Sequence, residues 1–142
     1  MTTGDPGVAT EAPLLLYDGV CALCNGAVTF VLRRDRRGLI RFAPLQGSTA
    51  AALIEHRPAL AAVDSMVWIE PQGGAAIRSD AAIAIGRYLG GFWGSLASLA
   101  RIIPRPLRDA VYDLVARLRY RLFGRYDACP IPPAEHRSRF LD

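Results

Sequence analysis

The chain of 142 residues has the length of one domain, and its hydrophobic fraction of 51% is sufficient for a core that needs no disulfide or metal. Its formal net charge of +4 comes from arginine alone, because the chain contains no lysine. With its abundant alanine this is typical of genomic codon bias, so the charge is no argument for a nucleic-acid partner and none is expected.

Residues 1–13 are rich in Thr, Gly, Pro and Ala, and we expect them to form a disordered lead. They lack the basic start and the apolar run of a signal peptide, so the expected location is cytoplasmic. In that reducing compartment a close pair of cysteines is more often catalytic or metal-binding than structural. The longest uncharged stretch of the second half, 88–100, is too short for a transmembrane helix, which needs roughly 20 apolar residues.

A buried strand and a helix are predicted on either side of two cysteines. Residues 14–17 form a continuous apolar run that ends in an Asp-Gly turn, as is typical of a strand buried on both faces. Apolar residues then recur at helical spacing from Cys24 to about Arg34, and Gly38 follows a basic last turn. Cys21 and Cys24 therefore lie where this strand meets this helix.

The next elements follow from alternation, turns and helix stops. Strands are predicted at 39–42, 66–69 and 75–78, and helices at 50–56 and after residue 79. Ser48 or Thr49 can cap the first of these helices and Ser79 the second. The Gln-Gly-Gly turn at 72–74 makes the last two strands an antiparallel hairpin. The order strand, helix, strand, helix, strand, strand, helix predicts an α/β fold of the thioredoxin-like type.

A helical extension is predicted beyond this core. It is interrupted at Gly90-Gly91 and at the Pro-Arg-Pro segment 104–106, where helices are expected to break. Its last helix has one apolar stripe, formed by Leu107, Val111, Leu114, Val115, Leu118 and Leu122. We expect this helix to dock on the domain and to end at Gly124. The domain boundaries are thus a lead at 1–13, a core at 14–91, and an extension with an irregular tail at 92–142 packed on the core.

The spacing Cys-x-x-Cys at a helix start indicates thiol–disulfide chemistry. Cys21 is the expected nucleophile, because free N–H groups and the helix dipole favour its thiolate. Such settings lower a thiol pKa of about 8.5 to roughly 3.5–7.5. Cys24 would resolve the mixed disulfide. Asp18 has two interpretations: its carboxylate relays the proton of Cys24, or it folds the turn by accepting hydrogen bonds from nearby amides.

Several separated segments together resemble the DCC family of thiol-disulfide oxidoreductases, which is named after one Asp and two Cys. The segments are Tyr17–Asn25, Phe42–Gln46, Asp64-Ser65, Arg78–Ala82 and Arg119–Gly124. The resemblance covers nearly the whole chain and implies a thioredoxin-like fold with disulfide-reductase activity. We expect no bound cofactor, an external thiol donor, and a disulfide-containing protein or a small thiol as substrate. One departure concerns Ser65-Met66, where ordinary thioredoxins place a cis-proline.

Two other classes of function fit the cysteines. In the first, Cys21, Cys24, Cys129 and His136 complete a tetrahedral zinc site. In the second, the chain is a protein-interaction module whose Cys pair is vestigial. Cys129 itself has three interpretations: a packed thiol, a second resolving cysteine or a glutathionylation site. No pattern indicates an oligomeric state.

Overall fold

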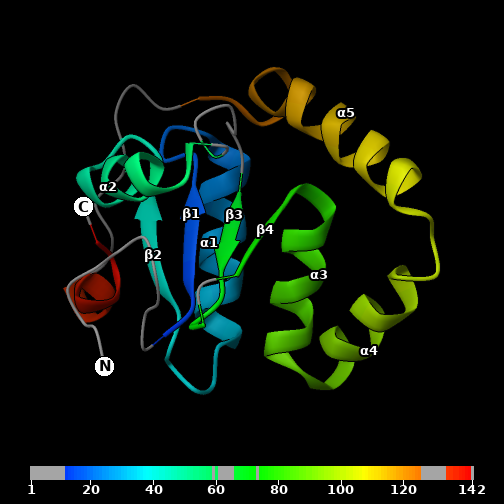
Figure 1. Ribbon diagram of the computed structural model, residues 1–142, viewed down its shortest axis with the longest axis horizontal. Coiled ribbons are helices and arrows are strands. Elements are labelled where there is room, and N and C mark those ends of the chain that lie inside the picture. Colours follow the sequence, from blue (N-terminus) through cyan, green and yellow to red (C-terminus); the bar gives the residue numbers. More distant parts are fainter. Residues whose placement is uncertain (1–11, 59, 61–65, 73, 126–133, 142) are drawn as a thin grey trace.

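The computed structural model describes residues 12–58, 60, 66–72, 74–125 and 134–141 (Figure 1). Its elements, in chain order, are β1 (Leu14–Tyr17), α1 (Ala22–Arg34), β2 (Arg41–Pro44), α2 (Ser48–His56), β3 (Val67–Ile69), β4 (Ala75–Ile77), α3 (Arg78–Leu89), α4 (Gly91–Ala100), α5 (Arg105–Phe123) and the short 3-10 helix η2 (Ala134–Arg139). The predicted order of the core elements is confirmed.

The described strands form one four-stranded sheet in the order β2-β1-β3-β4. β1 pairs in parallel with β2 and antiparallel with β3, so that Leu15 lies opposite Phe42 on one side and Trp68 on the other. β3 and β4 form the predicted antiparallel hairpin. This mixed sheet with its crossover helix α1 is a thioredoxin-like α/β arrangement, as the sequence predicted.

The alternation of β1 divides the core into two clusters. Leu15 and Tyr17 pack with buried residues of α1 and α3, whereas Leu14 and Leu16 pack with α2 on the opposite face. Because both faces are covered, every residue of β1 is buried. This explains why the strand reads as a continuous apolar run. Its carboxyl end then leads directly to the cysteine loop.

Some predicted boundaries and caps differ in the structure. β2 occupies 41–44 and not 39–42, and its last residue is Pro44, which is compatible with the edge position of this strand. Ser48 and Thr49 lie inside α2, because Gly47 takes the N-cap position. The predicted cap Ser79 also lies inside its helix and is buried. Its hydroxyl donates to Asp109 of α5, so this side chain joins two helices.

Beyond the sheet, α4 packs closely on α3, and α5 runs along the outside of both α3 and α1 (Figure 1). The close approach depends on Gly86, because a Cβ at this position would lie 2.8 Å from Cβ of Ala97. α5 ends at Phe123 and Gly124 follows with φ 93°, as expected for a glycine that terminates a helix. The predicted end of α5 is confirmed. None of the described helices is long and apolar enough to cross a membrane.

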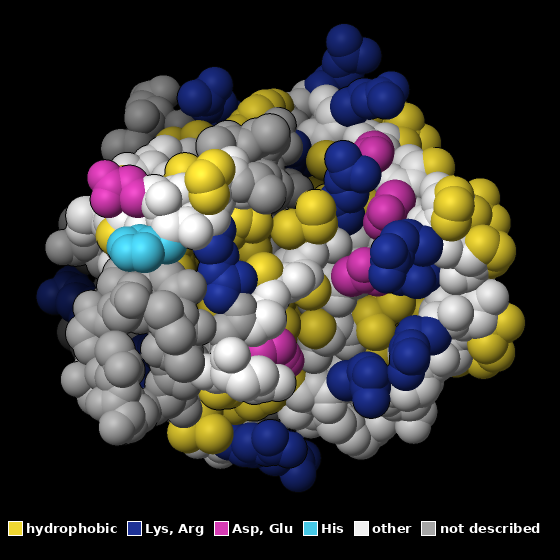
Figure 2. Space-filling model, in the orientation of Figure 1, with side chains coloured by type: hydrophobic (Ala, Val, Ile, Leu, Met, Phe, Trp, Pro, Cys, Tyr) yellow, Lys and Arg dark blue, Asp and Glu magenta, His cyan; other side chains and the backbone are white. Residues whose placement is uncertain are grey.

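Most of the apolar stripe of α5 lies on the outside of the molecule. Leu107, Leu114 and Leu122 of the apolar stripe are 57%, 54% and 65% exposed, whereas Arg119 is only 5% exposed. Figure 2 shows these hydrophobic side chains along the outer edge of the molecule over α4 and α5. α5 does dock on the domain, as expected, but most of its apolar stripe faces away from it. The helix is held through its polar side, where Tyr120 and Arg119 bind Asp18.

Candidate active site

Cys21 is the N-cap of α1, in an extended conformation with φ −85° and ψ 123°. Its Sγ accepts a hydrogen bond from the backbone N–H of Cys24 at 3.3 Å, in the way that a Ser or Asp cap does. Both cysteines are free thiols, and Cys21 is entirely buried. The sulfur of Cys21 is thus held at the positive end of the helix dipole, where negative charge is stabilised.

Cys24 lies one turn further along α1 and is also buried. Burial raises the pKa of its thiol to about 12, and the hydrogen bond and charge interaction with Cys21 act in the same direction. The positive charge of Arg119 opposes this rise without cancelling it. Cys24 therefore stays protonated at neutral pH. The two sulfurs are chemically different, since only that of Cys21 receives the N–H of a helix terminus.

Asp18 lies in the loop between β1 and Cys21, and its carboxylate is buried. One oxygen, Oδ1, accepts from the backbone N–H of Val20 at 3.2 Å and from Gln46 Nε2 at 2.8 Å. The other, Oδ2, accepts from the Tyr120 hydroxyl and lies 3.4 Å from Arg119 Nη2. Both oxygens are thus occupied by donors from the loop, from the segment after β2 and from α5.

These donors decide the protonation state of Asp18. Burial acts to raise the pKa of the carboxyl, but the hydrogen bonds from Tyr120, Gln46 and Val20 and the charge of Arg119 together hold it below its usual value. The carboxylate is therefore ionised at neutral pH. For Tyr120, burial and the hydrogen bond to Asp18 raise the pKa, so its hydroxyl remains a donor.

Two amide side chains fix the path of the cysteine loop. Gln46 Oε1 accepts from the backbone N–H of Gly19 at 3.0 Å, while its Nε2 binds Asp18. Asn25 Nδ2 donates to the carbonyl oxygens of Gly19 and Cys21 at 2.8 and 2.9 Å. Because the carbonyl of Cys21 and its neighbours are held in this way, the sulfur is aligned with the helix terminus by side chains from two separate segments.

The end of α5 lies beside Cys21. The backbone carbonyl of Gly124 accepts from the N–H of Ala22 at 3.2 Å. Arg125 forms an isolated antiparallel bridge with Cys21. These backbone contacts place the segment after α5 against the nucleophile candidate, which is consistent with its complete burial.

A small cavity of about 210 Å³ opens next to Cys24. Its lining residues come from α1, from the start of the β3 segment and from α5: Leu23, Cys24, Ala27, Met66, Tyr112, Val115, Ala116 and Arg119. The surface of the cavity is apolar. Leu23, which lies between the two cysteines in the sequence, is one of the residues that line it. An apolar group of a substrate that entered it would lie against the Cys24 thiol.

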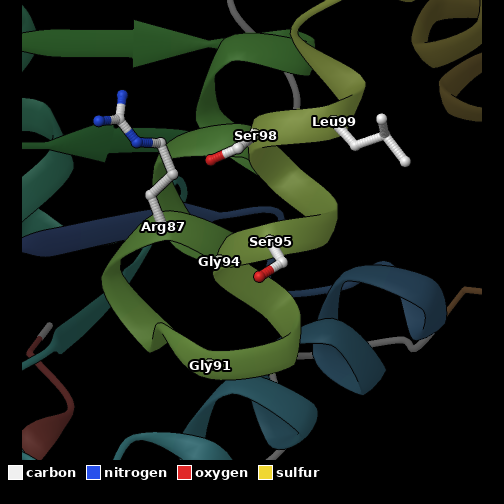
Figure 3. Close-up of a pocket in the computed structure, with 6 residues that line it drawn as sticks. All are labelled: Arg87, Gly91, Gly94, Ser95, Ser98 and Leu99. Carbon is white, nitrogen blue, oxygen red and sulfur yellow. The ribbon is translucent and has the colours of Figure 1, made fainter.

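A larger hollow of about 690 Å³ lies between α3 and α4 and shares no lining residue with the cysteine cavity (Figure 3). The side chains of Arg87 and Leu99 point away from each other there, and Ser95 and Ser98 project from different turns. Their polar groups do not converge on one point. This hollow therefore offers no chemistry to compare with that of the Cys pair.

The sequence placed Asp18, Cys21 and Cys24 close together, and the structure describes all three in one network. It adds Asn25, Gln46, Arg119 and Tyr120, to which sequence reasoning gave no role. Their only signal was membership of the motif segments at 17–25, 42–46 and 119–124. Spacing cannot reveal such partners, because they come from elements far apart in the chain.

The described residues contain no group of three or more His, Cys, Asp or Glu side chains that could hold a metal ion. Cys129, which the zinc alternative requires, lies outside the described residues, as do the lead at 1–11 and Ser65 at the position of the thioredoxin cis-proline.

Comparisons with known proteins agree with this geometry. Residues 15–125 match the family of DCC1-like thiol-disulfide oxidoreductases. The chain is 43% identical over 130 residues to the uncharacterized protein YuxK of Bacillus subtilis, covering 90% of this chain and 93% of YuxK. It is 38% identical over 122 residues to a chloroplastic DCC family protein of Arabidopsis thaliana, covering 85% and 70% of the two chains. No solved structure is significantly similar to it. The chain belongs to the DCC1-like thiol-disulfide oxidoreductase family.

Proposed function

We propose that the protein is a protein-disulfide reductase whose redox couple is the pair Cys21 and Cys24. The observation that carries this proposal is the asymmetry of the pair. The sulfur of Cys21 receives the N–H of Cys24 at the start of α1, whereas burial and the neighbouring Cys21 raise the pKa of Cys24 to about 12. The sulfur of Cys21 thus lies at a helix terminus, where negative charge is stabilised, and Cys24 keeps its proton until it is needed.

The reaction follows from these two states. The Cys21 thiolate attacks one sulfur of a substrate disulfide, forms a mixed disulfide, and releases the other substrate sulfur as a thiolate. The released thiolate takes the proton of Cys24. The Cys24 thiolate then attacks Sγ of Cys21, which closes the Cys21–Cys24 disulfide and releases the second substrate thiolate. The substrate gains two electrons, and an external dithiol returns the pair to its reduced state.

Access to the pair supports a particular order of events. Cys24 lines the apolar cavity, while Cys21 is buried beside Gly124 and Arg125. A substrate disulfide reaches Cys21 only after this backbone segment moves, whereas an apolar neighbour of the disulfide fits against Leu23 and Cys24 without such a movement. Disulfide-containing proteins and small disulfides with an apolar flank are the substrates we propose. The free dithiol fits a reducing compartment such as the cytoplasm, although the Arabidopsis relative is chloroplastic.

We propose that Asp18 is a positioning residue and not a proton relay. Its two oxygens are occupied by Val20, Gln46, Tyr120 and Arg119, and the hydrogen bonds that lower its pKa also make it a weak base. Asp18→Asn should slow turnover without abolishing it. The pH dependence of turnover should keep its shape in Asp18→Asn, because a carboxyl whose pKa lies below its usual value does not titrate near neutral pH, whereas loss of a relay would change that shape.

The decisive experiment measures insulin reduction and glutathione-disulfide reduction by the full chain and two variants. Cys21→Ser should abolish turnover, because no mixed disulfide forms. Cys24→Ser should stop after one step and accumulate a mixed disulfide with the substrate, visible by mass spectrometry under non-reducing conditions. Full activity in Cys21→Ser would contradict the mechanism. Stoichiometric zinc held through the pair in protein purified without added metal would favour the zinc alternative.

A further inference from the structure

The outer side of α4 and α5 exposes a continuous set of large apolar side chains, which we call the outer face. Its members are Phe92, Leu96 and Leu99 on α4, Ile102 and Ile103 in the connection, and Leu107, Val111, Leu114 and Leu122 on α5. Phe92 and Ile102 are 70% and 77% exposed. In Figure 2 the hydrophobic side chains form the edge of the molecule over these two helices. Proteins that work free in water seldom expose an apolar surface of this extent.

The spacing of these residues makes the face regular. Phe92, Leu96 and Leu99 are separated by four and three positions, and Leu107, Val111 and Leu114 repeat the same separations on α5. Residues at such spacings lie on one side of a helix. The opposite side of α5 carries polar residues that bind the domain, and the apolar side is not covered by the part of the chain that the structure describes.

Most of the charged side chains on and around α4 and α5 are arginines. Residues 91–125 contain seven arginines and two aspartates. Both aspartates are paired with residues of α3, since Asp109 accepts from Ser79 and Asp113 lies 3.7 Å from Arg78. Figure 2 shows the acidic side chains inward from the apolar edge. Arg105, Arg108 and Arg119 are ion-paired as well, so the charge available beside the outer face comes from the remaining arginines.

Two of these arginines border the apolar stripe of α5 directly. Arg117 and Arg121 are three and seven positions after Leu114, which places them on the same side of the helix as this leucine and at its margin. Both are exposed, and the structure records no acidic partner for either among the described residues. Long arginine side chains at the border of an apolar face can reach anionic groups while the apolar side chains are buried.

We propose that the outer face docks on an anionic lipid bilayer, with α4 and α5 lying in the plane of the interface. Apolar side chains at helical spacing enter the boundary between headgroups and acyl chains, and the bordering arginines bind lipid phosphates. A second copy of the chain fits less well, because two such faces would bring arginines of both copies together. This inference is independent of the reductase activity proposed above.

The experiment is co-sedimentation of the full chain with vesicles of phosphatidylcholine alone and of phosphatidylcholine with about one third phosphatidylglycerol. Strong binding to the anionic vesicles that weakens with salt is expected. Arg117→Glu/Arg121→Glu should weaken it by at least roughly 10-fold, because each basic residue near an anionic surface contributes about 1 kcal/mol, a factor of about five. Val111→Ser/Leu114→Ser should weaken binding as well, and both positions are exposed enough for the fold to tolerate the change.

The charge-matched control is Arg33→Glu/Arg36→Glu, which changes two exposed arginines at and just after the end of α1, outside the outer face. This variant should bind anionic vesicles like the parent chain. If the control and Arg117→Glu/Arg121→Glu lost the same amount of binding to anionic vesicles, the effect would come from net charge alone, and the proposal would be overturned. The proposal would also be overturned if the chain bound neither type of vesicle and formed a dimer instead. If Val111→Ser/Leu114→Ser dissociated that dimer, the outer face would be assigned to a second copy of the chain. Reductase activity in solution should be the same in all three variants.

Discussion

The carboxylate of Asp18 and the guanidinium of Arg119 form an ion pair of 3.4 Å between residues 101 positions apart in the chain. Both residues are buried: Asp18 is 3% exposed and Arg119 is 5% exposed. The pair joins the loop that carries Cys21 to α5. The same helix leads to Gly124, which contacts the start of α1, so Asp18 connects the position of the nucleophile to the position of the segment beside it.

Removing one member of this pair should be costly. Arg119→Met should lower the free energy of unfolding by about 3–5 kcal/mol, because Asp18 is left as an uncompensated buried charge. The measurement is urea denaturation at pH 7. In the double variant Asp18→Asn/Arg119→Met the loss should be clearly smaller than the sum of the single losses. Strictly additive losses would show that the two groups do not interact.

The contribution of Asp18 to the free energy of unfolding should be lost at low pH. Its folded pKa lies below the usual value, so the contribution is fully present above the unfolded pKa of about 3.9 and is lost as the pH falls through the lower folded pKa. Unfolding free energies of the parent chain and of Asp18→Asn should therefore differ by a constant amount at neutral pH and converge in strong acid. A difference that grows on acidification would contradict the ionised state of Asp18.

A substitution at Gly124 should expose Cys21. Gly124 has φ 93° and ψ 176°, a region that other residues occupy only at a cost of roughly 1–3 kcal/mol, although a Cβ there would meet no atom within 4 Å. Gly124→Ala should therefore loosen the backbone contact with Ala22. Alkylation of native Cys21 by iodoacetamide, located by fragment mass spectrometry, should become faster.

The matched control is Gly38→Ala, which also places a side chain at positive φ, 67°, and leaves the contact between Gly124 and Ala22 unchanged. Cys21 should react in Gly38→Ala at the rate of the parent chain. Equal acceleration in both variants would mean that general destabilisation, and not the local contact at Gly124, controls access to the thiol.

The contact between α3 and α4 should depend on the absence of a side chain at Gly86. In Gly86→Ala the new Cβ would lie 2.8 Å from Cβ of Ala97 and 3.1 Å from the carbonyl oxygen of Trp93. We expect a loss of about 1–3 kcal/mol in the free energy of unfolding from this overpacking. Gly26→Ala, at an exposed position of α1 with no atom within 4 Å, should instead gain up to about 1 kcal/mol. Thermal denaturation of both variants tests the difference.

Elements with local signals could be predicted from the amino-acid sequence. The apolar run of β1, the helical spacing of α1 and the glycine turn before β4 each depend on residues next to one another, and all three elements occur at or close to the predicted positions. The place of Cys21 and Cys24 at the start of a helix followed from the same local pattern. So did the end of α5 at Gly124, because a glycine is needed for the positive φ found there.

The binding partner of each polar side chain, and the side of α5 that meets the domain, could not be predicted and follow from the folded arrangement. The apolar stripe of α5 is visible in the sequence, because the spacing shows which residues share one side of the helix. The spacing does not show whether that side contacts the domain or the solvent. Buried polar groups must be satisfied, and Asp18 and Ser79 find their donors and acceptors on Arg119, Tyr120 and Asp109 of the opposite side. Those contacts join residues distant in sequence, so they exist only once the chain has folded.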